Sequence, residues 1–300
     1  MSNITITGSL GNIGQRLTRS LVAKGHRVTV ISSQPERAAA IEALQAIPAI
    51  GTVTDRDFLQ RAFKDADAVY TMIPPDFTAT DIRAYIKGVG EGYAAAIAQT
   101  GVKHVVNLSA IGSHRADGPG PTGANHHVEQ QLNALPDTHV LHLRPGMFYT
   151  NFLGSIPLIR YQQLIGSNYD ATANIVLSHP EDIAAAAFEA LDTRAFIGKQ
   201  VQYIAGDEQN GGAIARILGE AVGLPNLTWT AFPDEAMLQA LLQTGMSEQM
   251  ARVYIIEIGI AIRNGDLIDD YRLHQGQASG KITLADFARE FAAVYTASAS

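Results

Sequence analysis

The 300-residue chain contains no cysteine, a single tryptophan and no long apolar run. Without cysteine it has no disulfide, no thiolate metal site and no thiol nucleophile. No apolar run approaches the roughly 20 residues that a membrane-spanning helix needs, so we expect no membrane association. Because a strand-like segment begins at Ile4, we also expect no signal peptide and a cytoplasmic location.

Positive charge is scarce as well. Twenty-two lysines and arginines stand against 29 aspartates and glutamates, which gives a formal net charge of −7. Surfaces that bind nucleic acid concentrate positive charge, so this balance argues against a nucleic-acid partner. The hydrophobic fraction of 46% and the mean hydropathy of +0.03 are typical of a soluble globular protein with one large α/β unit or two lobes.

Three regularly spaced glycines lie where a strand-like segment gives way to a helix-like one: Gly8, Gly11 and Gly14. Residues 4–7 are β-branched, and apolar residues recur at helical spacing from residue 13 onward. Glycine permits a tight turn and the close approach of a pyrophosphate, and the following helix N-terminus offers unpaired N–H groups. The pattern predicts a dinucleotide site, whose contacts are Gly8, Leu10, Gly11, Asn12, Ile13 and Gly14.

Strand-like and helix-like segments alternate through the first half of the chain. The strands are expected at residues 4–7, 28–31, 50–53, 68–73, 104–108 and 140–143. This alternation predicts an α/β fold, a Rossmann-type doubly wound parallel sheet. The second half is less regular and predicts a smaller, mostly helical substrate lobe. The expected domains are residues 1–150 and 151–300, with the chain free to cross between lobes.

Several segments, in order along nearly the whole chain, resemble the NmrA-like group of atypical short-chain dehydrogenases. They are the glycine turn, residues 105–112, the helix with His127-Val128-Glu129, and residues 143–152, 179–184 and 283–288. The group includes NAD(P)H:quinone oxidoreductases, triphenylmethane-dye reductases, isoflavone-reductase-like enzymes and non-catalytic redox sensors.

The end of the second strand normally selects between the two nicotinamide cofactors. Here Ser32 and Ser33 are followed closely by Arg37, and Glu36 lies too far along to be the obvious acid for NAD. Hydroxyls and a guanidinium suit a 2′-phosphate, which favours NADP(H) over NAD(H). Alternatively, Arg37 is only a solvated helix residue.

The resemblance implies further cofactor contacts. Asp55 is expected near the adenine, and Ile73 and Pro74 beneath the nicotinamide-side ribose, mainly through their backbone. Ser109, at the end of the fifth strand, is expected near the nicotinamide or else caps the strand. Phe148 is interpreted either as an aromatic wall for a flat acceptor or as a core residue.

The catalytic pair of ordinary short-chain dehydrogenases is absent. None of the ten tyrosines is followed four residues later by lysine, so the usual proton exchange with a carbonyl oxygen is not available. Aligned on Glu129, the lysine position falls at Asn125 and the tyrosine position at Pro121. The remaining catalytic candidates are Ser109, Tyr149 as a proton donor, and Asn125.

Hydride transfer to an electron-poor acceptor needs no strong general acid, since alignment and exclusion of water suffice. We therefore predict an NADP(H)-dependent reductase of a small planar acceptor, of the quinone, azo or triphenylmethane-dye type, acting as a monomer or homodimer. The alternative is a non-catalytic sensor of the NADPH/NADP⁺ ratio that acts through a protein partner. A third hypothesis is an isoflavone-reductase-like enzyme. Enzymes of that kind keep a catalytic lysine, and this chain has Asn125 at the corresponding position.

Three other features have open interpretations. His126 and His127 are adjacent on a predicted helix and point about 100° apart, so no metal site is predicted. His179 before Pro180 is interpreted as a helix start. A stripe of apolar residues forms either a lid or core: Met237, Leu238, Leu241, Leu242, Met246 and Met250.

Overall fold

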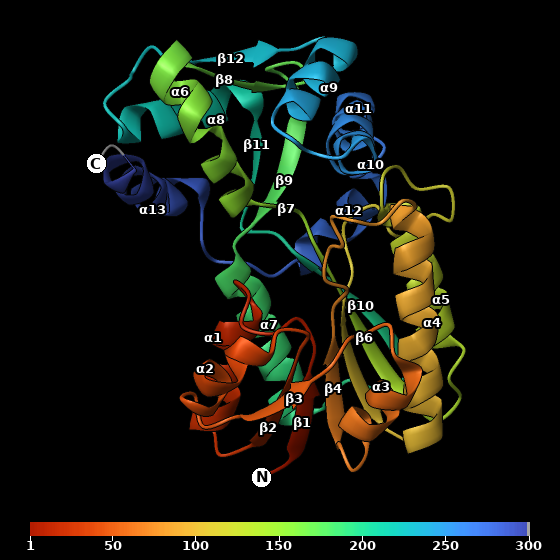
Figure 1. Cartoon of the computed structure of the whole chain (residues 1–300). Coiled ribbons are helices and arrows are strands. Elements are labelled where there is room, and N and C mark those ends of the chain that lie inside the picture. Colours follow the sequence, from red (N-terminus) through yellow and green to blue (C-terminus); the bar gives the residue numbers. More distant parts are fainter. Residues whose placement is uncertain (299–300) are drawn as a thin grey trace.

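The computed structural model describes residues 1–298, which form two lobes (Figure 1). Within this range, seven parallel strands build the central sheet in the order β10-β6-β5-β4-β1-β2-β3. The order reverses between β1 and β4, which places a crevice at the carboxyl ends of these strands. The strands are β1 (Asn3–Ile6), β2 (Arg27–Ser32), β3 (Ile47–Ile50), β4 (Ala68–Thr71), β5 (His104–Leu108), β6 (His139–Pro145) and β10 (Lys199–Ile204). The predicted Rossmann-type fold is confirmed.

Helices cover both faces of this sheet (Figure 1). One apolar layer joins the sheet to α1 (Gly14–Ala23), α2 (Ala38–Glu42) and α7 (Pro180–Thr193). A second layer joins it to α3 (Arg56–Phe63), α4 (Ile82–Thr100) and α5 (Thr122–Asn133). The predicted third strand at residues 50–53 is displaced, since β3 spans Ile47–Ile50; Pro48 is tolerated because β3 is an edge strand.

Helix α4 has glycines at three positions and is nevertheless continuous over 19 residues. A Cβ on Gly90 would collide with the Val128 side chain, so this glycine lets α4 and α5 pack closely. Gly92 faces Leu59 of α3, and Gly88 borders open space. No helix within residues 1–298 is both long and apolar enough to cross a membrane.

The second lobe combines short strands with helices around its own core. Its strands are β7 (Met147–Phe148), β8 (Leu164–Ser167), β9 (Asn174–Ser178), β11 (Asp207–Asn210) and β12 (Thr228–Ala231). Its helical elements are η2 (Tyr149–Ser155), α6 (Ile156–Gln162), α8 (Gly211–Ala221), α9 (Asp234–Gln243), α10 (Glu248–Met250), η3 (Ala251–Ile256), α11 (Glu257–Asn264), α12 (Asp269–His274) and α13 (Leu284–Ala297).

The chain crosses between the lobes more than once. After β9 it returns to the first lobe, where α7 packs against α1 and β10 pairs with β6. A single division at residue 150 would therefore cut these two elements away from the sheet that they complete.

Three of the crossings lie together and are hydrogen-bonded to one another. The Ser178 hydroxyl accepts from Gly146 N–H at 2.8 Å and donates to the Ile204 carbonyl at 2.6 Å. Gly206 N–H donates to the Leu177 carbonyl at 2.9 Å. We call the contacts among residues 146, 177–178 and 204–206 the crossing junction.

Candidate functional site

The glycine turn lies at the carboxyl end of β1. Gly8 has φ +86°, and a Cβ there would lie 2.5 Å from Met72 Sδ. A Cβ on Gly14 would collide with the Ser9 carbonyl oxygen, whereas Gly11 is exposed and has nothing nearer than 3.5 Å. Two of the glycines are therefore required by the turn itself, and the third leaves space above it.

The first turn of α1 presents free backbone donors beside these glycines. Its N-cap, Ile13, makes no side-chain cap. Asn12 is exposed and Leu10 is half-buried against the first core layer. An uncapped helix N-terminus beside a glycine turn is a ready anion site. The structure thus brings all six predicted turn contacts together.

The end of β2 faces the same turn. The Ser32 hydroxyl is buried and accepts from Gln34 N–H at 3.2 Å, so it holds the local turn. Ser33 is exposed. Arg37 Nη1 lies 3.5 Å from Ser9 Oγ, which brings the guanidinium over the glycine turn. Of the three predicted phosphate contacts, Ser33 and Arg37 are left available.

Asp55 and the segment after β4 occupy the neighbouring strand ends. Asp55 caps α3 by accepting from Phe58 N–H at 3.0 Å. The segment through Ile73 and Pro74 is fixed through its backbone, because the Tyr85 hydroxyl donates to the Pro74 carbonyl at 3.0 Å. It leads directly to a pocket between the lobes.

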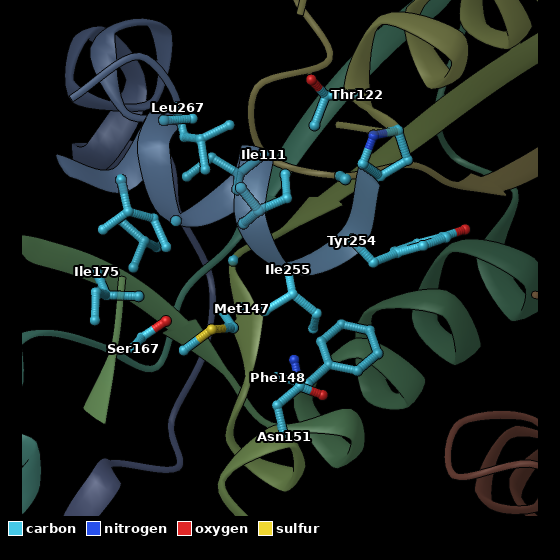
Figure 2. A pocket seen from close by; sticks show the side chains of 18 of the residues that line it. Ile111, Thr122, Met147, Phe148, Asn151, Ser167, Ile175, Tyr254, Ile255 and Leu267 are labelled. Carbon is cyan, nitrogen blue, oxygen red and sulfur yellow. The ribbon is translucent and has the colours of Figure 1, made fainter. Parts of the chain in front are cut away.

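This pocket has a volume of about 590 Å³. The first lobe contributes segments that follow β4, β5 and β6, and the second lobe contributes β9 and the helical segment from Met250 to Ile268 (Figure 2). Its described lining contains no aspartate, glutamate, lysine, arginine or histidine. The polar lining residues are Thr122, Asn151, Ser167, Tyr169, Asn174 and Tyr254. We call it the acceptor pocket.

One wall of the acceptor pocket is π-helical. The helical stretch from Glu248 to Asn264 is divided into α10, the π-helical η3 and α11. Such segments are rare and frequently occur at functional sites. Of the predicted apolar stripe, only Met250 lines the pocket. Leu238 is buried against Ala251 and Ile256. The other four residues pack against this cluster or against the second apolar layer. Leu238 is therefore a core residue, and most of the stripe is half-buried and lies outside the pocket lining.

Ser109 belongs to a buried polar network beneath the pocket. Its hydroxyl donates to Glu129 Oε1 at 2.6 Å, and Arg144 binds both oxygens of Glu129 at 3.0 and 2.6 Å. Arg144 also reaches Tyr203 and, on α12 of the second lobe, Asp270, each at 3.1 Å. Burial lowers the pKa of Arg144, but the hydrogen bonds and charge of Glu129 outweigh it and raise the pKa overall. Ser109 is thus held by Glu129 and does not line the pocket.

Tyr149 and Asn125 also lie outside the acceptor pocket. Tyr149 is fully buried, donates to the Ile282 carbonyl at 3.0 Å and stacks on Phe287 at 5.4 Å. Burial raises the pKa of this phenol, and its contacts make it a core residue of the second lobe. Asn125 is half-buried on α5, whereas Pro121 and Thr122 at the start of that helix do line the pocket.

Phe148 does line the acceptor pocket, beside Asn151 (Figure 2). Tyr254 and Ile255 face it from η3 and were not predicted, because nothing in an apolar helical stretch distinguishes pocket from core.

The singled-out histidines have separate partners. His179 caps α7 by accepting from Glu181 N–H at 3.2 Å, which confirms the predicted helix start. His127 pairs with Glu91 at 3.1 Å, and His126 contacts the Ser113 carbonyl at 3.0 Å.

The parallel sheet, the glycine turn and the pocket at the strand ends define a Rossmann-type α/β protein with a second lobe over its carboxyl edge. The model of the NmrA-like family matches residues 1–260, so the chain belongs to the NmrA-like family.

The comparisons also identify similar proteins. Over 236 residues the chain is 28% identical to the (4-alkanoyl-5-oxo-2,5-dihydrofuran-3-yl)methyl phosphate reductase of Streptomyces griseus, covering 75% of this chain and 77% of that protein. The structure resembles an NADPH-dependent quinone oxidoreductase of Escherichia coli complexed with NADPH, with a TM-score of 0.81, 20% identity and coverage of 96% and 99%. It also resembles a Citrobacter triphenylmethane reductase complexed with NADP(H), with a TM-score of 0.83, 17% identity and the same coverage. These two likenesses show the fold.

Proposed function

We propose that this protein binds NADP(H) across the carboxyl edge of the sheet and reduces a small planar acceptor held in the acceptor pocket. The observation that carries the proposal is the pocket itself, which opens where the segment through Ile73 and Pro74 leaves β4. Reductases of quinones and triphenylmethane dyes have the same fold, which supports the reaction class.

The glycine turn fits a dinucleotide, since the space over Gly11 and the uncapped N-terminus of α1 suit a pyrophosphate. Ser33 and Arg37 would contact a 2′-phosphate, and the segment through Ile73 and Pro74 would lie along the nicotinamide-side ribose. Asp55, as the α3 cap, would border the adenine. The cofactor, when bound, supplies the hydride.

The chain's own task is then to place and desolvate the acceptor. Phe148 offers a flat apolar wall, and the largely apolar lining excludes water from the hydride path. The hydrogen bond from Ser109 to Glu129 holds the end of β5 in place beside the pocket. The described lining contains no carboxylic acid. This arrangement suits acceptors whose reduced form is stabilised by its own conjugation.

The lining also restricts the charge of the acceptor. The Streptomyces relative is named for a substrate that carries a phosphate, and phosphate recognition normally uses arginine, lysine or backbone nests. The described lining of the acceptor pocket contains no arginine and no lysine. We therefore propose an acceptor without a localised charge.

The test measures NADPH binding and NADPH oxidation separately. Purified protein is titrated with NADPH and then mixed with quinones, azo dyes and triphenylmethane dyes, with loss of NADPH absorbance as the readout. Turnover with at least one uncharged or charge-delocalised acceptor is expected. Tight binding without turnover across the panel would replace the reductase by the redox-sensor hypothesis, and absence of binding would overturn both.

A further inference from the structure

Tyr254 brings a phenol into the acceptor pocket from the second lobe. It lies on the π-helical η3 and is half-buried in the lining. In Figure 2 its ring lies at the opposite end of the pocket from Ile175 and Ser167. Its hydroxyl lies at the outer tip of the ring at that end (Figure 2).

That end of the pocket borders the cofactor side. Tyr254 lines the pocket together with Pro75, which directly follows Ile73 and Pro74, and it packs against the same apolar core layer as Ile73. The neighbouring Tyr85 hydroxyl holds the Pro74 carbonyl of that segment. The segment beside Tyr254 is therefore the one to which we assign the nicotinamide-side ribose.

The hydroxyl of Tyr254 has no hydrogen-bond partner among residues 1–298, unlike those of its neighbours. Tyr85 and Tyr93, which belong to the same apolar layer, each donate to a backbone carbonyl. The side chain is only half-buried, so the Tyr254 hydroxyl is open to water and available to a ligand. Burial also raises the pKa of Tyr254, so the phenol keeps its proton and remains a donor. A bound acceptor would take this hydrogen bond in place of water.

The first lobe has no tyrosine hydroxyl at the position where ordinary short-chain dehydrogenases have their catalytic tyrosine. Pro121 lines the acceptor pocket at the start of α5, and this is the position at which the family resemblance puts the tyrosine of ordinary short-chain dehydrogenases. The pocket thus lacks a hydroxyl from that tyrosine position and has one from the facing lobe.

We infer that Tyr254 is a catalytic residue for acceptors that develop negative charge on oxygen, to which its hydroxyl donates a hydrogen bond. The inference rests on the proposed reductase function. A quinone takes up a hydride, two electrons with one proton, and becomes an anion whose charge resides on a carbonyl oxygen. Water then supplies the second proton to give the hydroquinone, while NADPH leaves as NADP⁺. Tyr254 keeps its own proton throughout.

The same chemistry predicts which acceptors do not need Tyr254. A cationic triphenylmethane dye also takes up a hydride, but its product is the neutral leuco form and no oxyanion develops. A hydrogen-bond donor therefore contributes to quinone reduction and not to dye reduction. A residue that only packed the pocket would affect both acceptors alike.

The experiment compares Tyr254→Phe with the wild type on a quinone and on a triphenylmethane dye, each with NADPH. For the quinone we expect kcat/KM to fall about 10- to 100-fold, toward the cost of losing one oxyanion donor. For the dye we expect a change of less than about twofold, because an interaction absent from the transition state does not alter the rate. Tyr161→Phe, on the exposed surface of α6, is the matched control and should leave both rates unchanged.

Each other outcome has a distinct meaning. Equal losses on both acceptors, or no loss on the quinone, would overturn the role of Tyr254 while the reductase function stands. A wild type that binds NADPH but reduces neither acceptor would overturn the reductase proposal, and the role of Tyr254 with it. The dye reaction also reports folding, since a misfolded variant would lose both activities.

Discussion

The cofactor end and the acceptor end of this site are built by different means. At the cofactor end, backbone geometry is decisive: Gly8 has a left-handed φ, Gly14 leaves no room for a side chain, and α1 begins uncapped. At the acceptor end, side chains from several distant segments converge, and no short motif connects Phe148 with Tyr254. One end of the site is thus specified by a short sequence motif, and the other by how distant segments pack together.

Glu129 belongs to the buried polar network that joins the first lobe to α12 of the second lobe, so its substitution is expected to have the largest effect. Glu129→Gln removes the buried carboxylate that binds the Arg144 guanidinium at two positions, leaving Asp270 as its charged partner, and should cost about 3–5 kcal/mol of unfolding free energy. Denaturant unfolding measures this cost. Glu91→Gln, which removes a solvent-exposed pair with His127, should cost less than about 1 kcal/mol. Similar costs for both variants would show that the buried ion pair of Glu129 contributes no more to stability than the exposed pair of Glu91.

Gly14→Ala and Gly11→Ala separate folding from cofactor binding within the glycine turn. Gly14→Ala forces the Ser9 carbonyl to move and should cost about 1–3 kcal/mol of stability, with NADPH binding weakened about 10- to 100-fold. Gly11→Ala has ordinary space for a methyl group and should weaken NADPH binding with unfolding nearly unchanged. Calorimetric titration and thermal unfolding provide the two readouts. If Gly11→Ala binds NADPH normally, the pyrophosphate does not lie over this turn.

Arg37→Gln examines the specificity of the cofactor end. Losing one charged contact to a 2′-phosphate should weaken NADPH binding about tenfold and leave NADH binding unchanged. Arg19→Gln, on the exposed side of α1, is the matched control and should affect neither cofactor. An equal change for NADPH and NADH would assign Arg37 to the fold and remove the argument for NADP(H).

Asn174→Lys examines the acceptor end and should have the smallest effect. Asn174 is an exposed lining residue, so the added cation would meet the acceptor near solvent, where a charge pair contributes about 1 kcal/mol. The preference for a sulfonated quinone over its parent should rise about fivefold in kcat/KM. Thr172→Lys, which is exposed outside the pocket, should change nothing. A rise with both variants would indicate general surface attraction.

The sequence allowed the first lobe to be predicted almost element by element, because its strands and helices carry strong periodic patterns and its turns carry glycine. The glycine turn could be located for the same reason, and the role of its residues in cofactor binding stays a prediction. Arg37 was left open, since only its 3.5 Å approach to Ser9 distinguishes it from a solvated residue.

The acceptor end could not be predicted in this way. Tyr149 and Phe148 are neighbours in sequence, yet one is fully buried and the other lines the pocket. Which side chain faces a cavity depends on how the second lobe packs over the sheet. Met250 and Leu238 belong to the same apolar stripe, yet Met250 lines the pocket and Leu238 is buried in the core. Their sequence pattern does not distinguish these two places.

The crossing junction has a kinetic consequence. A protein whose lobes are joined by one flexible linker can close by rotating one lobe onto the other, and binding then waits for that motion. Here three strand connections are tied together by Ser178, and Gly146 can carry no side chain because Val176 fills the space beside it. The lobes are therefore held as one unit, and the acceptor pocket exists before its ligand arrives. Encounter should accordingly be a single bimolecular step whose observed rate rises linearly with acceptor concentration.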